Sequence, residues 1–127
     1  YHSVAEGFLR ARGVTEYQSV LIGHLVAGGQ VANSAVDNSV NPVWRRALLH
    51  MVYAQGWSEG ATIEEQELAK LRLRTVVNIL ETITGDIPSG CYMNEADPNE
   101  PNWQQKFFGT REIYDRLKTI KNTVDPD

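Results

Sequence analysis

The sequence predicts an α+β fold, in which helices pack on one face of a mostly antiparallel sheet. Residues 18–27 are rich in Val, Leu and Ile, and residues 44–53 are mostly apolar on both alternating faces, so both runs are predicted to be strands. Two other stretches, at residues 62–84 and 110–122, repeat apolar side chains at helical spacing. Since 127 residues suffice to bury one core, we expect a single domain over residues 1–127.

The composition is that of an ordinary globular chain, and it argues against several classes of site. The net charge is −4 and no Lys/Arg cluster exceeds two neighbours, which argues against a nucleic-acid surface. The single cysteine, Cys91, excludes an internal disulfide and a multi-cysteine metal site. No apolar run approaches the about 20 residues of a membrane-spanning helix. The three histidines lack His-x-x-x-His spacing, so we expect no metal site.

The first third of the chain predicts a helix, a strand and a turn. Residues 1–12 form the helix, with Gly13 as its stop. Residues 18–27 form a buried strand that contains His24, which we interpret as a core histidine rather than a catalytic one. The diglycine that follows predicts a turn, after which residues 30–36 pair back as a weak second strand. This diglycine lacks the spacing of a nucleotide-binding loop.

The middle of the chain predicts a loop, a central strand and a second turn. Residues 37–42 are polar and read as loop. Residues 44–53 are apolar on both alternating faces, which is typical of a strand covered on both sides. His50 lies within this strand, and we again expect a core histidine. Residues 56–60 form a turn.

Residues 62–84 give the clearest helix signal. Thr62 and Glu65 fit a capping box at its start. Gly85 is expected to end this helix, and Pro88 to prevent its continuation. Its apolar stripe consists of Leu68, Leu71, Val76, Ile79, Leu80 and Ile83.

The stretch after Gly90 predicts a short strand. Residues 91–96 alternate with period two, which places Tyr92 and Asn94 on one face as a hydrogen-bonding pair. Two prolines then predict a loop that ends at Trp103. A last amphipathic helix follows, with Ile113, Tyr114, Leu117 and Ile120 facing inward.

No complete catalytic constellation is present, since there is neither a nucleophile elbow nor a phosphate loop. The candidate polar cluster is Tyr92, Asn94, Glu95 and Asp97. These side chains either cap a strand and order the loop after it, or face a ligand. Cys91 has no neighbouring base or basic residue in the sequence, which argues against a reactive thiol.

The same stretch resembles the C-terminal signature of the berberine-bridge-enzyme-like FAD-linked oxidoreductases, on the vanillyl-alcohol-oxidase type of fold and in its fungal form. The resemblance runs from about Ile22 to Asp127. It rests on these segments: Asn41-Pro42-Val43-Trp44-Arg45, Tyr92-x-Asn94-Glu95-Ala96-Asp97, Trp103, Phe107-Phe108-Gly109, Tyr114-x-Arg116-Leu117-x-x-Ile120-Lys121 and Asp125-Pro126.

The resemblance implies that the chain is the C-terminal substrate-domain portion of a flavoprotein, whose sheet covers the flavin. Tyr92 and Asn94 match the family's Tyr-x-Asn and would lie close to FAD. Glu95 stands where plant members often carry a tyrosine base, so a glutamate base is a candidate in its place. The implied reaction is oxidation of a small organic substrate, such as a secondary metabolite or a sugar, with oxygen as acceptor. Full-length relatives are often secreted.

The FAD-binding domain of that family has no counterpart in the sequence, and this leaves three possibilities. The chain is a part of a larger FAD-linked oxidoreductase, or a shortened flavin-free relative that binds a small molecule or guides a non-redox cyclisation. A third possibility is a structural partner that completes an FAD-binding chain. We do not expect this chain alone to hold FAD tightly, and we expect its exposed sheet edges to self-associate or to bind the missing domain.

Overall fold

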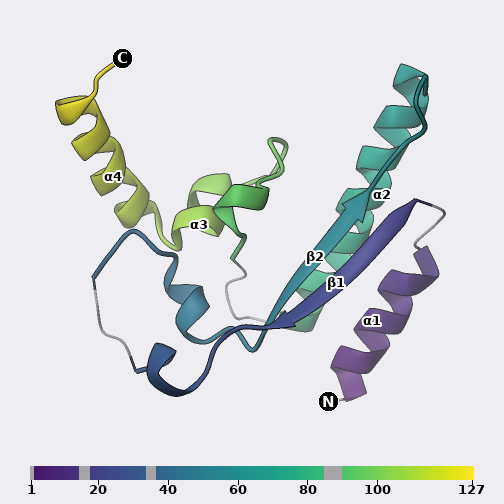
Figure 1. Ribbon diagram of the computed structural model, residues 1–127, viewed down its shortest axis with the longest axis horizontal. Helices are drawn as coiled ribbons and strands as arrows, with labels where there is room; N and C mark the ends of the chain where they lie inside the picture. The colour runs from purple at the N-terminus through teal and green to yellow at the C-terminus, as the bar shows by residue number, and fades with distance from the viewer. Residues whose placement is uncertain (1, 15–17, 34–36, 85–89) are drawn as a thin grey trace. The chain divides into compact units, whose positions relative to one another are not determined.

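The computed structural model describes residues 2–14, 18–33, 37–84 and 90–127, which divide into two compact units (Figure 1). The first unit comprises Tyr1–Leu25 and Leu49–Ile87, and the second comprises Val26–Leu48 and Pro88–Asp127. Each unit is therefore built from two stretches of chain that are far apart in the sequence. None of the described helices is long and apolar enough to cross a membrane.

The first unit holds two helices and one antiparallel pair of strands. They are α1 (His2–Val14), β1 (Ser19–Leu25), β2 (Leu49–Gln55) and α2 (Ile63–Thr84). The strands are antiparallel over their whole length, with Ser19 opposite Gln55 and Leu25 opposite Leu49. Helix α2 packs against both β2 and α1, so the strands and helices share one small core.

Small side chains let α1 approach α2 closely. A Cβ at Gly7 would lie 2.5 Å from the Cδ1 atom of Ile83, and Ala11 is buried. Val76 is 0% exposed and is the largest fully buried side chain among the described residues. The predicted apolar stripe of α2 is confirmed only in its second half, because Leu68 and Leu71 are exposed.

The second unit is made of short helices and loops. They are η1 (Gly29–Val31), η2 (Pro42–Arg45), η3 (Met93–Glu95), α3 (Trp103–Phe108) and α4 (Arg111–Val124). The side chain of Thr110 caps α4 by accepting the backbone N–H of Ile113 at 3.3 Å. The predicted C-terminal helix is thus confirmed, but its predicted inward face is wrong at Ile120, which is exposed. Helix α3 was not predicted.

The prediction of an α+β fold is confirmed, but the prediction that it is mostly sheet is wrong. Within the described residues the only sheet has two strands, and more than half of these residues lie in helices. β2 therefore pairs with only one strand among the described residues, and the prediction that it is a central strand is wrong. β1 is a strand as predicted but is not buried, since Val20 and Ile22 are exposed.

Local hydrogen bonds explain two of the wrong strand predictions. Asn41 accepts the backbone N–H of Val43, and with Pro42 at its first position a 3-10 helix forms where the strand was expected to begin. At η3 the carbonyl of Tyr92 accepts the N–H of Glu95 at 3.1 Å, which closes a helical turn instead of extending a strand.

Other boundaries fall as follows. The weak strand predicted at residues 30–36 is wrong for its described part, which is η1 followed by a turn. α1 runs through Gly13 to Val14, so Gly13 is not its stop. The capping box is confirmed, because Glu65 accepts the Thr62 N–H at 2.7 Å and the Thr62 hydroxyl accepts the Glu65 N–H at 3.2 Å. The roles predicted for Gly85 and Pro88 fall outside the described residues.

Candidate functional site

Tyr92 and Asn94 form a hydrogen-bonded pair on the surface of the second unit. The side-chain Nδ2 of Asn94 donates to the Tyr92 hydroxyl at 2.8 Å. The Tyr92 ring meets the Trp44 ring edge-on, with centroids 5.8 Å apart and planes at 80°. Tyr92 is 40% exposed, so part of this aromatic and amide surface faces outward. The two side chains lie together as predicted, although they sit at and in a 3-10 helix rather than on a strand.

Asn41 joins its own segment to α3, at a carbonyl that also binds the segment before Tyr92. Its Nδ2 donates to the Lys106 carbonyl at 2.7 Å, and its Oδ1 accepts the Val43 N–H at 3.0 Å. The same Lys106 carbonyl accepts the N–H of Cys91 at 2.9 Å. Asn41 is only 4% exposed, so both ends of its amide are satisfied inside the unit.

Two glycines let these segments approach each other. A Cβ at Gly90 would lie 2.3 Å from Cγ1 of Val43, and a Cβ at Gly109 would lie 2.5 Å from Cδ of Pro42. Gly109 also has a φ of 91°, which disfavours any residue with a side chain. The resembling segments at residues 41–45 and 107–109 are therefore in direct contact.

A buried ion pair orders the loop that leads into α3. The Nζ of Lys106 lies 2.6 Å from Oε1 of Glu100, and both side chains are largely buried. The backbone N–H of Glu100 donates to the carbonyl of Asp97 at 3.1 Å. The Asp97 carboxylate accepts the N–H of Asn99 at 2.8 Å, so Asp97 orders this loop, which was one of its two predicted readings.

The aromatic residues of the signature pack between α3 and α4. Tyr114 meets Trp103 edge-on at 5.1 Å and Phe108 at 5.4 Å, and the Arg111 guanidinium lies 5.5 Å from its ring centre. These contacts fix the angle between the two helices.

Arg116 links α4 to residue 37 of the same unit. Its two terminal nitrogens donate to the two carboxylate oxygens of Asp37 at 2.9 and 3.1 Å. This hydrogen bonding and the positive charge of Arg116 hold the pKa of the Asp37 carboxyl below its usual value. The pair is exposed, so it orients segments more than it stabilises them.

The remaining predicted site residues are also placed by the structure. Glu95 ends η3 and is exposed. Cys91 is half-buried. Three residues that sequence reasoning did not single out, Asn41, Glu100 and Lys106, hold the site together. Asn41 entered the sequence analysis only as part of the Asn41–Arg45 segment that resembles the family. No sequence pattern indicated the Glu100–Lys106 ion pair.

The histidines belong to the first unit, whereas the Tyr92–Asn94 pair belongs to the second. His24 and His50 face each other across the strands, with ring centroids 6.1 Å apart. The prediction that His24 is a core residue is wrong, because its side chain is exposed, whereas His50 is half-buried. Among the described residues, no group of three or more His, Cys, Asp or Glu side chains could hold a metal ion.

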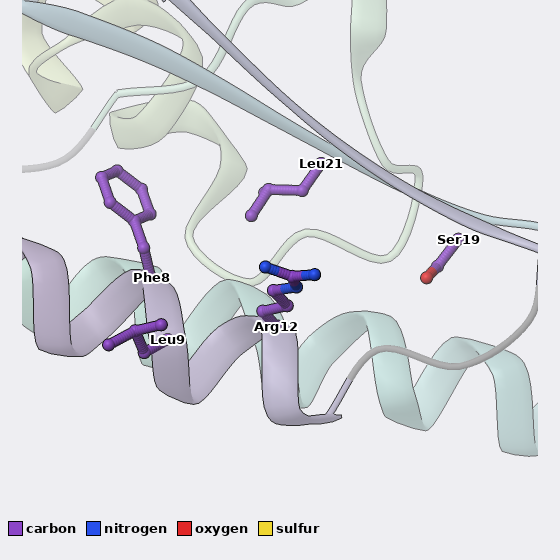
Figure 2. Close-up of a pocket in the computed structure, with 5 residues that line it drawn as sticks. All are labelled: Phe8, Leu9, Arg12, Ser19 and Leu21. Atoms are coloured by element: carbon purple, nitrogen blue, oxygen red, sulfur yellow. The ribbon is translucent and has the colours of Figure 1, made fainter.

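The first unit also has an open hollow of about 410 Å³ between α1 and β1. Figure 2 shows Phe8 and Arg12 rising from α1 toward the strands, while Leu21 points from β1 toward them. Leu9 and Ser19 complete its lining. The hollow contains none of the predicted site residues.

Comparison with known proteins finds a family that is similar to the segment carrying the Tyr92–Asn94 pair. Residues 91–127 match the model of the family described as berberine and berberine like. This part of the chain is therefore similar to the berberine-like family. The matched residues include those that make the contacts described above, from Cys91 to α4.

The curated relatives that the chain matches include fungal proteins named FAD-linked oxidoreductases. An uncharacterized one from Arthroderma benhamiae is 46% identical over 107 residues, which cover 83% of this chain and 18% of the relative. The FAD-linked oxidoreductase patO of Aspergillus clavatus is 40% identical, over 78% of this chain and 17% of its own length. The FAD-linked oxidoreductase sor8 of Hypocrea jecorina is 32% identical, over 96% of this chain and 21% of its own length.

The chain therefore spans about a fifth of the length of the curated relatives that it matches. No solved structure is detectably similar to it. The resemblance inferred from the sequence is confirmed, and the matched relatives carry the FAD-linked name.

Proposed function

We propose that this chain forms part of an FAD-linked oxidoreductase that oxidises a small organic substrate with oxygen as acceptor. The observation that carries the proposal is the Tyr92–Asn94 pair, which lies at the start of the berberine-like domain and is partly exposed. Homology to fungal FAD-linked oxidoreductases supports the choice of cofactor. The sizes of those relatives support a larger protein, of which this chain supplies one part.

The residues present fit a flavin chemically. A flavin ring offers a flat aromatic face and an edge of carbonyl and N–H groups. The Tyr92 ring gives an aromatic surface, while the Asn94 amide carries both a donor and an acceptor group. Because the Tyr92 hydroxyl accepts from Asn94, its own hydrogen is not used in that bond. When bound, FAD would supply the hydride-accepting chemistry.

Within this proposal, each side chain has a separate role. Tyr92 and Asn94 bind and orient the flavin edge. Trp44 supports the Tyr92 ring by its edge-on contact. Glu95 is the candidate base that removes a proton from the substrate, since it adjoins the pair and carries a carboxylate at its tip. Its exposure in this chain means that the base role requires burial by bound flavin and substrate.

The strands of the first unit support the expectation of a partner. Within residues 18–33 and 37–84 each strand has one neighbour, so each also has an open edge. Val20, Ile22 and Leu25 of β1 are exposed. We propose that these edges pair with further polypeptide of the oxidoreductase or, in a shortened form, with a second copy. Light scattering that shows only monomers of the 127-residue chain would contradict the second alternative.

The experiment that tests the proposed function is an absorbance spectrum of the complete natural polypeptide that carries this sequence, recorded before and after denaturation. We expect stoichiometric flavin, and we expect Asn94→Ala and Tyr92→Phe to perturb the bound spectrum while the protein stays folded. Asn99→Ala is the matched control, because Asn99 lies in the neighbouring loop and its side chain donates to Asp97, two residues away. A folded protein without flavin would contradict the proposal and favour a small-molecule binding protein or a non-redox cyclase.

A further inference from the structure

The Lys106 carbonyl is a shared acceptor that links two segments of the second unit. It receives the side-chain amide of Asn41 at 2.7 Å and the backbone N–H of Cys91 at 2.9 Å. Cys91 immediately precedes Tyr92, so this bond fixes the direction in which the chain enters the Tyr92–Asn94 pair. We call Asn41, the Lys106 carbonyl and the Cys91 N–H the Asn41 junction.

The Asn41 amide has little room to move within this junction. A Cβ at Gly90 would lie 2.8 Å from its Nδ2, and a Cβ at Gly109 would lie 3.0 Å from its Oδ1. The backbone of these two glycines therefore passes close to the two ends of the amide. Close packing on both sides, together with two hydrogen bonds, holds one orientation of Asn41.

Asn41 also places the ring that supports Tyr92. Its Oδ1 accepts the Val43 N–H and so starts η2. Trp44, the third residue after Asn41, lies in η2 and meets the Tyr92 ring at 5.8 Å. The Asn41 amide thus binds the carbonyl that also holds the backbone before Tyr92, and it caps the helix that carries the ring beside Tyr92.

From this geometry we infer that Asn41 is a positioning residue for the Tyr92–Asn94 pair. It acts through Lys106 and Trp44 and does not itself touch a ligand. The inference rests on the proposed function, in which that pair faces the flavin. Its consequence is that the orientation of Tyr92 depends on an atom supplied by a segment 51 positions earlier in the chain.

The test is Asn41→Asp in the complete natural polypeptide that carries this sequence. This change keeps the oxygen that accepts the Val43 N–H but replaces the donor to Lys106 by a second oxygen. We expect the Cys91 amide to exchange its hydrogen at least ten times faster, as followed by mass spectrometry of the peptide that contains it. In the flavin-bound protein, the reduction potential should move in the direction in which Tyr92→Phe moves it.

Two variants serve as controls. Asn38→Asp makes the same isosteric change at an asparagine that accepts the Val40 N–H in the same way, but on the surface. Thr110→Ala removes the cap of α4 and destabilises the same unit without touching the junction. Both should leave the Cys91 exchange rate within twofold of its original value and leave the potential unchanged.

The outcomes separate the positioning role from the proposed function. Flavin bound with unchanged exchange and potential in Asn41→Asp would overturn the positioning role alone, as would equal changes in Thr110→Ala. Faster exchange in a protein without flavin would support the junction and contradict the proposed function. If Asn41→Asp fails to fold, Asn41→Ser gives the same test, because its hydroxyl still caps η2 but is too short to reach Lys106.

Discussion

The two units of the chain are stabilised in different ways. In the first unit the buried side chains are apolar and small, and all belong to α1 or α2: Ala11, Ala69 and Val76. In the second unit, the buried side chains are Phe107 and two polar ones, Asn41 and Glu100. Among the described residues, every buried polar side chain therefore belongs to the second unit.

This difference has a consequence for how each unit constrains its sequence. Apolar core positions accept exchanges among side chains of similar volume at small cost. A buried amide or carboxylate must keep its partner, because an unmade hydrogen bond or an uncompensated charge is expensive. The second unit is accordingly the one in which a family signature can be recognised, and residues 91–127 are the part that matches.

The largest expected effect is the loss of the buried ion pair in the second unit. Lys106→Met leaves the Glu100 carboxylate buried without its cation, which costs about 3 to 5 kcal/mol of unfolding free energy. Urea denaturation, with hydrogen exchange read separately for peptides of each unit, would measure it. The double variant Glu100→Met with Lys106→Met should recover most of the loss. Equal stability of the single variant and the parent would show that the pair contributes little.

The next largest effect is expected at Gly109. Gly109→Ala places a Cβ 2.5 Å from Pro42 and forces a side chain on a residue whose φ is 91°, so we expect a loss of about 2 to 3 kcal/mol. Gly60→Ala is the matched control, because Gly60 has a φ of 83° but nothing within 4 Å of its Cβ position. The difference between the two variants in thermal unfolding measures the crowding alone. If they lose the same stability, the close approach of Gly109 to Pro42 is not required.

The same contrast explains which features the sequence predicted. Periodicity and capping patterns predicted α1, α2 and α4, because those signals are local and repeat along one face. They failed at residues 44–45 and 93–95, where a single side-chain or turn hydrogen bond overrides an alternating pattern. The Tyr92–Asn94 pair was predicted from this alternation, and it forms although the segment is a 3-10 helix. The junction at Asn41 could not be predicted from periodicity, since it joins residues 41 and 106 through one carbonyl.

A smaller effect is expected in the first unit. Val76→Ala removes two methyl groups from a fully buried position and should cost about 2 kcal/mol, through lost apolar burial and the cavity left behind. Leu71→Ala lies on the same helix but at a side chain that is 63% exposed, so it should change stability by less than about 0.5 kcal/mol. Chemical denaturation of both variants would compare them. Similar losses would mean that the exposed half of the α2 stripe is covered in solution, as pairing with further polypeptide would require.

The smallest effect is expected for the exposed Asp37–Arg116 pair, and it should depend on pH and salt. Arg116 holds the pKa of Asp37 below its usual value in the folded chain, so the pair contributes stability that is fully present above the unfolded pKa. As the pH falls from the unfolded pKa through the lower pKa that Asp37 has in the folded chain, Asp37 gains its proton and this contribution is lost. The stability difference between the parent and Arg116→Met should therefore be measurable at neutral pH in low salt, and should shrink in acid and in molar salt.

Lys70→Met is the matched control, because Lys70 pairs with Glu67 within one helix of the first unit and closes no loop. Arg116, by contrast, joins α4 to a residue 79 positions away. If both variants lose the same small amount, the Asp37–Arg116 pair adds nothing beyond an ordinary surface ion pair. A larger, salt-sensitive loss of stability for Arg116→Met would show that this surface pair also stabilises the second unit. Polar bonds between distant segments would then matter on its surface as they do inside it, around Tyr92 and Asn94.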